Sequence, residues 1–340
     1  MIVALDTQLA VGTATGAGVY QRDLATALHE LGANVHELCA PWLDPWRFDR
    51  RVLWDQVLLP LQAARSGAEL LHASAGTMPL LRTLPVVVTV HDLAWLRVQA
   101  HTRPYARAYF GTIQARAYRT AAAIVCDSHF SADEYRALVD PRANPAVVYP
   151  GVDARFATIA RNPDEAPFAL VVGTVEERKN LLVLVEALPA LPELRVVSVG
   201  PHTSYADTVR ARAAELNVAD RLDLRGYVTR EELDDLHARA MCALIPSRYE
   251  GFGYALAEAL CAGLPAIAAR SSSLVEVAAE SAPLVDPDGV AGWMDAIRAL
   301  LADRDRAETE AASHRSAHVA RFAWPTAALS MLDVYQGVVT

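Results

Sequence analysis

The sequence predicts an α/β protein that consists of two doubly wound domains. Three observations support this class. Short apolar, β-branched runs alternate with segments of helix length, which is typical of parallel sheets covered by helices. The alternation stops at residues 155–167, a stretch without periodicity, and then starts again. A chain of 340 residues is also too long for one ordinary domain and fits two. We therefore expect a domain boundary near residue 163.

In the first half, the apolar runs predict five strands, at residues 2–6, 69–73, 86–91, 124–127 and 146–149. The run at 86–91 has the composition of a strand buried on both faces. A glycine-rich loop at 11–18 precedes a helix that we expect from about residue 19 to 31. The sequence S-A-D-E at 131–134 has the pattern of a helix N-cap.

The second half repeats the pattern with strands at 168–175, 195–200, 221–227, 241–246 and 265–269, and it ends in a helix over 321–338. In doubly wound sheets, ligands bind beyond the carboxyl ends of the strands. A cleft between two domains is the default place for a binding site. Residues that directly follow strands are therefore the first candidates for function.

Composition excludes several classes of protein. The net charge is −9, so nucleic acid is not an expected partner. No apolar run approaches the roughly 20 residues of a membrane-spanning helix. The N-terminus enters a strand directly and lacks the basic segment of a signal peptide. The four cysteines have no metal-ligand spacing. These features predict a cytoplasmic protein with reduced cysteines.

The most informative segment is Glu250–Pro265, which reads E-G-F-G-Y-A-L-A-E-A-L-C-A-G-L-P. It follows a predicted strand and continues as a helical pattern that ends at a glycine and a proline. Its first glycines let the backbone approach a ligand closely. The start of a helix offers unpaired N–H groups to an anion. Two carboxylates, Glu250 and Glu258, lie eight residues apart. The segment therefore predicts a ligand with phosphate and hydroxyl groups, such as a nucleotide sugar.

A second candidate site follows the strand predicted at 168–175. There, Arg178 and Lys179 precede a helix, and Lys179 is the only lysine in the chain. Two cations beside a helix N-terminus form an anion site. A diphosphate leaving group needs such charge, because negative charge grows on it as the bond to the sugar breaks. The alternative is a surface salt bridge with Glu176 or Glu177.

These segments resemble the retaining glycosyltransferases of family 4, whose GT-B fold has two Rossmann-like domains that face an interdomain cleft. That family carries two glutamates separated by seven residues, in an E-G-F-G/A context followed by C/A-G-x-P. The resemblance extends over nearly the whole chain, through segments at 16–20, 90–93, 127–131, 148–153 and 321–324. In GT-B proteins the C-terminal helix crosses back to the first domain. Residues 1–163 with 323–340 would then form an acceptor domain, and residues 164–322 a donor domain.

The resemblance implies a role for each matching residue. Glu258 would bind ribose hydroxyls, and Glu250 would bind hydroxyls of the donor sugar. His91 would lie near the reacting carbon of the donor. The remaining positions would contact the nucleotide sugar largely through cations or backbone groups: Arg178 and Lys179 with Gly173 and Thr174 at the diphosphate, Tyr227 and Val228 at the base, Gly251, Phe252, Gly253 and Tyr254 at the sugar or phosphates, and Gly16 and Gly18 at the phosphate or acceptor.

Thr174 departs from the family pattern, because many members carry arginine at that position. The missing charge would have to come from Arg178. The variant G-T-x-x-x-R-K-N looks like a branch that contains mannosyl- and rhamnosyltransferases of surface polysaccharides, which slightly favours GDP-mannose over UDP- or dTDP-sugars as the donor. No motif requires a metal or another cofactor, and the acids of Asp286-Pro287-Asp288 indicate a turn.

The expected activity is transfer of a hexose from a nucleoside diphosphate sugar to a hydroxyl acceptor, with retention of configuration, in the assembly of surface polysaccharide or another glycoconjugate. Glu250 is of the right type for a covalent nucleophile, but the resemblance implies a front-face displacement instead. Two alternatives remain open: a nucleotide-sugar 2-epimerase on the same fold, and a two-lobed sugar-binding protein without catalysis.

An arginine-rich helix is expected between Arg103 and Arg119. Its arginines could meet a phospholipid surface or an anionic, lipid-linked acceptor, which would make the protein peripheral at the inner face of a membrane. An ordinary solvated helix face is the alternative.

Overall fold

The computed structural model describes residues 1–12, 16–97 and 104–340, and the chain divides into two compact units, residues 1–151 with 323–340 and residues 152–322. The boundary therefore lies at residues 151–152 rather than near 163. Residues 152–163 pack on the second unit because they satisfy carbonyl groups at the end of helix α10 (Arg230–Arg239). Asn162 N donates to Ala238 O at 2.9 Å, and the Arg161 guanidinium donates to Ala240 O at 2.7 Å.

The first unit contains a sheet of parallel strands in the order β2-β1-β3-β4-β5-β6. Its central strands β3 and β4 are buried along their whole length, as expected for apolar, β-branched runs between two helical layers. The strands are β1 (Ile2–Asp6), β2 (Asn34–Leu38), β3 (Leu70–Ala73), β4 (Val86–Val90), β5 (Ala123–Cys126) and β6 (Ala146–Val147).

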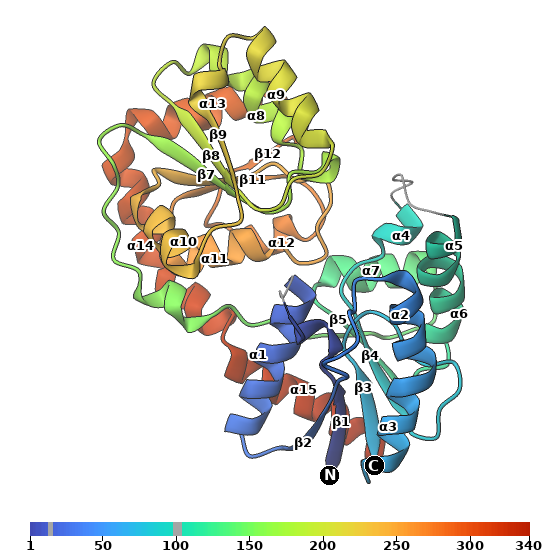
Figure 1. Ribbon diagram of the computed structural model, residues 1–340. Coiled ribbons are helices and arrows are strands. Elements are labelled where there is room, and N and C mark those ends of the chain that lie inside the picture. The colour runs from blue at the N-terminus through green and yellow to red at the C-terminus, as the bar shows by residue number, and fades with distance from the viewer. Residues whose placement is uncertain (13–15, 98–103) are drawn as a thin grey trace. The chain divides into compact units, whose positions relative to one another are not determined.

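Helices cover both faces of this sheet (Figure 1). On one face, α1 (Gly16–Glu30) and the C-terminal α15 (Trp324–Val339) share a core. The other face is covered by one long helix, which comprises α2 (Phe48–Leu53), the π-helical turn η2 (Trp54–Leu58) and α3 (Leu59–Arg65), and by α6 (Gln114–Tyr118) and α7 (His129–Leu138). The remaining short elements are η1 (Gln8–Ala10), α4 (Ala94–Arg97), α5 (Pro104–Arg107) and the π-helical turn η3 (Ala108–Ile113).

The second unit contains a sheet of parallel strands in the order β12-β11-β10-β7-β8-β9. Its strands are β7 (Phe168–Val172), β8 (Arg195–Val199), β9 (Leu222–Gly226), β10 (Cys242–Ile245), β11 (Ala266–Ala269) and β12 (Leu284–Val285).

Helices α8 (Leu181–Ala187), α9 (Tyr205–Glu215) and α13 (Val290–Ala302) cover one face of the second sheet. Helices α10, α11 (Tyr254–Ala262) and α12 (Leu274–Ala278) lie on the other, with α14 (Arg304–Arg321) beside α11. Four 3-10 turns complete this unit: η4 (Ala154–Thr158), η5 (Glu177–Lys179), η6 (Leu188–Ala190) and η7 (Ala219–Arg221).

Some predicted elements begin elsewhere. Helix α7 is capped by Ser128, whose side chain accepts from Ser131 N at 3.0 Å, so the cap predicted at Ser131 is wrong. Helix α1 begins at Gly16 rather than near Val19. Strand β2 escaped prediction because its sequence, N-V-H-E-L, is polar and half-exposed at the sheet edge.

Each sheet has one topological switch point, where two adjacent strands are connected to the rest of the chain on opposite sides of the sheet. The switch points lie between β1 and β3 in the first unit and between β7 and β10 in the second. Ligands of doubly wound sheets bind at these positions, outside the carboxyl ends of the strands. The residues that follow these four strands are therefore the ones placed to meet a ligand.

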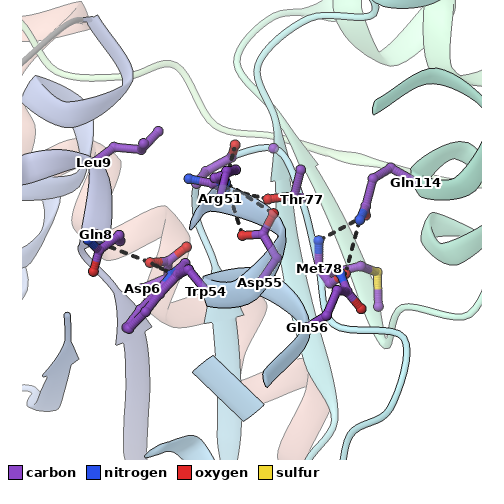
Figure 2. Close-up of polar contacts among 12 residues, drawn as sticks. Asp6, Gln8, Leu9, Arg51, Trp54, Asp55, Gln56, Thr77, Met78 and Gln114 are labelled. Carbon is purple, nitrogen blue, oxygen red and sulfur yellow. Dashed lines mark hydrogen bonds and ion pairs between the residues drawn. The ribbon is translucent and has the colours of Figure 1, made fainter. Parts of the chain in front are cut away.

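A buried polar cluster joins the end of β1 to the long helix at 48–65 (Figure 2). The Asp6 carboxylate accepts from Gln8 N at 3.1 Å and from Trp54 Nε1 at 3.0 Å. Arg51 Nε donates to Asp55 at 3.0 Å. Burial raises the pKa of Asp6 to about 6, although the Arg51 charge opposes this rise. These contacts fix the helix beside the β1–β3 switch point.

Candidate active site

The second unit brings Arg178, Lys179 and Glu250 together at its switch point. Lys179 Nζ donates to Glu250 Oε1 at 2.5 Å, and Arg178 Nη1 lies 3.2 Å from Oε2 of the same carboxylate. The two cations follow β7 and the carboxylate follows β10, which is its neighbour in the sheet. Sequence reasoning assigned these residues to one ligand, but it did not predict that they pair with one another.

The electrostatics of this cluster keep Glu250 ionised. Glu250 is 7% exposed, and burial alone would raise its pKa. The Lys179 and Arg178 charges outweigh that effect, so the pKa of Glu250 lies below its usual value. Arg178 also donates to Glu176 at 2.8 Å, which means that the predicted salt-bridge alternative is present as well. The Lys179 side chain remains partly exposed, and its ion pair with Glu250 fixes the position of the ammonium group.

Backbone geometry places the lysine. Gly173 has φ = +138°, and a Cβ atom there would lie 3.4 Å from Lys179 Cε, so the lysine stem runs along the Gly173 backbone. Thr174, Lys179 and Ser247 line a small hollow beside this glycine. Thr174 therefore lies close to Lys179, but its uncharged side chain does not replace the arginine that many family members carry at this position.

Two serines that sequence reasoning missed hold the turn that carries Glu250. Glu250 N donates to Ser272 Oγ at 2.9 Å. Ser273 Oγ donates to Glu250 O at 2.9 Å and to Phe252 O at 2.8 Å. Both residues follow β11, and the run of three serines at 271–273 directly after a strand is the signal that could have revealed them.

The turn leads into helix α11. Gly253 occupies its N-cap position with φ = +99°, a conformation that favours glycine. Gly251 and Phe252 are buried, and the Phe252 ring packs edge-on against Phe322 at 5.5 Å. The Phe252 side chain thus belongs to the core, which leaves the backbone N–H groups at the start of α11 as the groups suited to an anion.

Glu258 lies one helical turn after Tyr254 on α11 and is half-buried. Burial raises its pKa to about 7, and the Arg155 charge opposes this rise. Within the described ranges, no group donates a hydrogen bond to its carboxylate. Tyr227 and Val228 follow the edge strand β9, and Tyr227 is 67% exposed. Because β8 separates β9 from β7, these two residues do not join the Lys179 cluster.

In the first unit, His91 follows β4 and meets two partners that sequence reasoning did not assign to it. Its Nδ1 lies 2.6 Å from Asp127 Oδ2, and its Nε2 lies 2.9 Å from Ser74 O. Burial lowers the pKa of His91, but Asp127 outweighs this effect and the net shift is upward. Gly16 and Gly18 form the first turn of α1, and residues 13–15 of the predicted loop lie outside the described residues.

Among residues 1–12, 16–97 and 104–340, no three His, Cys, Asp or Glu side chains are placed to hold a metal ion. Asp286 and Asp288 form the predicted turn, with Asp288 N donating to Asp286 Oδ1 at 2.9 Å. None of the helices in these ranges combines the length and hydropathy that crossing a bilayer requires.

Comparison with known proteins supports one class. Residues 14–156 match the family model Glycosyltransferase Family 4, and residues 154–316 match the model Glycosyl transferases group 1. Sucrose-phosphate synthase from Thermosynechococcus elongatus superposes with a TM-score of 0.81 at 21% identity, with 99% of each chain covered. The chain has the GT-B fold, as predicted. The two matched segments together span residues 14–316.

Two relatives are more similar in sequence. The D-inositol 3-phosphate glycosyltransferase of Xylanimonas cellulosilytica is 38% identical over 179 residues, which are 51% of this chain and 43% of that protein. The GDP-mannose-dependent alpha-(1-6)-phosphatidylinositol monomannoside mannosyltransferase of Mycobacterium tuberculosis is 30% identical over 240 residues, 62% of this chain and 60% of that protein. The chain thus spans about half of the length of the curated relatives it matches.

Proposed function

We propose that the chain is a glycosyltransferase that moves a hexose from a nucleoside diphosphate sugar to a hydroxyl group. The supporting observation is the Arg178–Lys179–Glu250 cluster at the β7–β10 switch point. Cations at this position suit a diphosphate whose negative charge grows as the glycosidic bond breaks. The matches to glycosyltransferase family models favour the same activity.

In this proposal the second unit is the donor domain. Lys179 and Arg178 bind the diphosphate, and Glu250, which pairs with both cations, turns its oxygens to the sugar hydroxyls. Glu258 binds the ribose. The remaining contacts are those that the resemblance implies, at Gly173, Thr174, Tyr227, Val228, Gly251, Phe252, Gly253 and Tyr254 in this unit and at Gly16, Gly18 and His91 in the acceptor domain.

Transfer with retention of configuration is part of the proposal, by a front-face path without a covalent intermediate. Both oxygens of Glu250 lie against cations, which makes this carboxylate a poor nucleophile. Lys179 and Arg178 can supply the charge that a metal ion supplies elsewhere, so we propose that no metal is required. Excess chelator should then leave the turnover rate unchanged.

GDP-mannose is the proposed donor, with UDP- and dTDP-sugars as the next candidates. The R-K-N sequence at 178–180 favours the mannosyl- and rhamnosyltransferase branch. The name of the mycobacterial relative states that it depends on GDP-mannose. The first unit would bind the acceptor, for which we propose a lipid-linked glycan in the assembly of surface polysaccharide.

One face of the first unit supports a lipid-linked acceptor. On the helix at 48–65, Leu53, Val57 and Leu61 are exposed at intervals of four residues and form a stripe. The helix at 104–118 lies beside it, since the rings of Phe48 and Tyr105 are 4.6 Å apart. We call this surface the apolar–arginine face. Its further exposed apolar side chains, from these helices and the adjoining loops, are Trp42, Trp46, Leu80, Leu81, Tyr105 and Ile113.

The charge of the apolar–arginine face complements an anionic membrane. Residues 41–65, 80–84 and 104–120 contain, apart from the buried Arg51–Asp55 pair, seven arginines and two aspartates, although the whole chain carries −9. Tryptophan and tyrosine with arginine are typical of the membrane–water interface. We propose peripheral attachment to the inner face of a membrane through this face. It includes Arg107, Arg116 and Arg119 of the predicted arginine-rich helix, whereas Arg103 lies outside the described residues.

The test is incubation of the purified protein with labelled GDP-mannose, UDP-glucose and dTDP-rhamnose, with and without lipid extract as the acceptor source. The proposal expects transfer, or slow release of free sugar, from one donor. NMR of the first product should show the anomeric configuration of the donor. An epimerised nucleotide sugar would indicate the 2-epimerase, and binding without turnover would indicate a binding protein; either result contradicts the proposal.

A further inference from the structure

Both ring nitrogens of His91 lie within hydrogen-bond distance of an acceptor oxygen. Nδ1 lies 2.6 Å from the Asp127 carboxylate, and Nε2 lies 2.9 Å from the carbonyl oxygen of Ser74. A carbonyl oxygen has no proton to give, so Nε2 must carry one. An ionised carboxylate requires a proton on Nδ1 as well. A ring that donates from both nitrogens is an imidazolium.

The surroundings favour this charged form. Asp127 is buried, with 3% of its side chain exposed, and a buried carboxylate needs a cation beside it. Asp92, next in the chain, also raises the pKa of His91. The other nearby imidazole, His72, hydrogen-bonds to Tyr335 and Thr89, and burial lowers its pKa to about 3, so it stays neutral. Tyr20, whose ring packs edge-on to His91 at 4.8 Å, is also uncharged, because burial raises its pKa.

His91 is placed where a ligand of the first unit would bind. Its partner Ser74 directly follows β3, and Ser74 Oγ donates to Asp6 O at the end of β1. Ser74 therefore links His91 to the β1–β3 switch point. The His91 side chain keeps 22% of its surface exposed, so its charge is accessible although both N–H groups are used.

We propose that Asp127 is a positioning residue that holds His91 as an imidazolium, so that His91 supplies a fixed positive charge to glycosyl transfer and takes part in no proton transfer. The role in transfer rests on the proposed function; the charge state does not. Since both nitrogens donate within the protein, neither has a lone pair to accept the proton of an acceptor hydroxyl. A fixed positive charge stabilises negative charge that develops in a transition state.

The charge state is tested first, in a measurement that needs no activity. The protein is labelled with ¹⁵N-histidine, and the His91 resonances are assigned by comparison with His91→Gln. The proposal expects both ring nitrogens to remain protonated at pH 7.5, where a histidine with the ordinary pKa of about 6.5 is roughly nine-tenths neutral. A neutral His91 tautomer at pH 7.5 in the unaltered protein overturns the proposal, whether or not any donor is turned over.

The role is tested in Asp127→Asn, a change of nearly equal shape. At each pH, the turnover of the variant is divided by the turnover of the unaltered protein. We expect this ratio to follow the protonated fraction of His91, measured in the variant by the same NMR titration. For a pKa near 6.5, that ratio falls about 20-fold between pH 6 and pH 8. Asp127→Glu should restore the flat profile. A ratio that stays constant while His91 titrates contradicts the role in catalysis and leaves Asp127 a purely structural ion-pair partner.

Discussion

Lys179 is held by chemistry that the sequence only partly reveals. Its position as the only lysine, after a strand and before a helix, predicted a phosphate contact. Its bond to Glu250 was not predictable, because the two residues are 71 positions apart in the sequence. They come into contact because β10 lies beside β7 in the sheet. Residue types at strand ends can be read from a sequence, whereas the pairs they form depend on strand order.

Lys179→Gln tests the diphosphate contact. The amide can still donate to Glu250, so the buried carboxylate keeps a partner and the melting temperature should change little. Loss of the charge should lower turnover by about 100-fold or more. Arg306→Gln, which removes an exposed arginine paired with Glu310, is the matched control and should have no effect on turnover. Near-normal turnover of Lys179→Gln would refute the assignment.

Glu258 predicts a pH dependence of nucleotide binding. Its pKa is raised to about 7, and the ionised carboxylate is the form that accepts hydrogen bonds from two ribose hydroxyls. Affinity for a nucleoside, which lacks titrating phosphates, should therefore rise about tenfold between pH 6 and pH 8. Calorimetry should show this rise in the unaltered protein and a flat profile in Glu258→Gln. Equal slopes in both proteins would separate Glu258 from ribose binding.

At the scale of elements, buried strands were predictable and polar ones were not. The apolar runs at 86–91 and 241–246 appear as β4 and β10, because burial on both faces leaves a continuous apolar signature. Strand β2 and the two-residue β12 lack this signature. The helix at 48–65 was also not predicted. A helix prediction depends on the contrast between a polar and an apolar face, and the exposed apolar residues Leu53, Val57 and Leu61 reduce that contrast.

The backbone segments that follow the parallel strands β7 and β8 approach each other closely at Gly200. A Cβ atom at Gly200 would lie 2.3 Å from Gly173 O, and Gly200 has φ = +139°. Gly226 has φ = +73° with no atom within 4 Å of the corresponding position, so Gly226→Ala measures the backbone strain alone. Gly226→Ala should cost about 1–2 kcal/mol of unfolding free energy, and Gly200→Ala clearly more. Denaturant titration compares them; equal losses would show that the Gly200–Gly173 approach is unimportant.

At the scale of the whole molecule, strand–helix alternation that occurs twice predicted two doubly wound domains, and the resemblance to family 4 predicted the GT-B fold. The exact domain boundary was not predictable, because residues 152–163 carry no periodicity. Hydrogen bonds such as Asn162 N to Ala238 O assign these residues to the second unit. The C-terminal segment 323–340 joins the first unit, and its core residues Met331 and Tyr335 are fully buried there.

The apolar–arginine face predicts membrane binding. The protein should sediment with vesicles that contain phosphatidylglycerol and much less with pure phosphatidylcholine, and added salt should weaken binding. Leu81→Asp and Arg116→Glu should each reduce binding, whereas Arg306→Glu, on the second unit, should not. Binding that is equal for all vesicles and variants would contradict the assignment. A concentration-dependent dimer that the same two changes disrupt would instead identify a second copy as the occupant.

In the proposed function, the β7–β10 switch point binds the diphosphate of a nucleotide sugar. Calorimetric titration of GDP, UDP and dTDP against the matching nucleosides tests it most directly. We predict that one diphosphate binds at a single site far more tightly than its nucleoside, and that Lys179→Gln removes most of this difference. Equal affinity for nucleoside and diphosphate, or a difference that Lys179→Gln leaves intact, would contradict it.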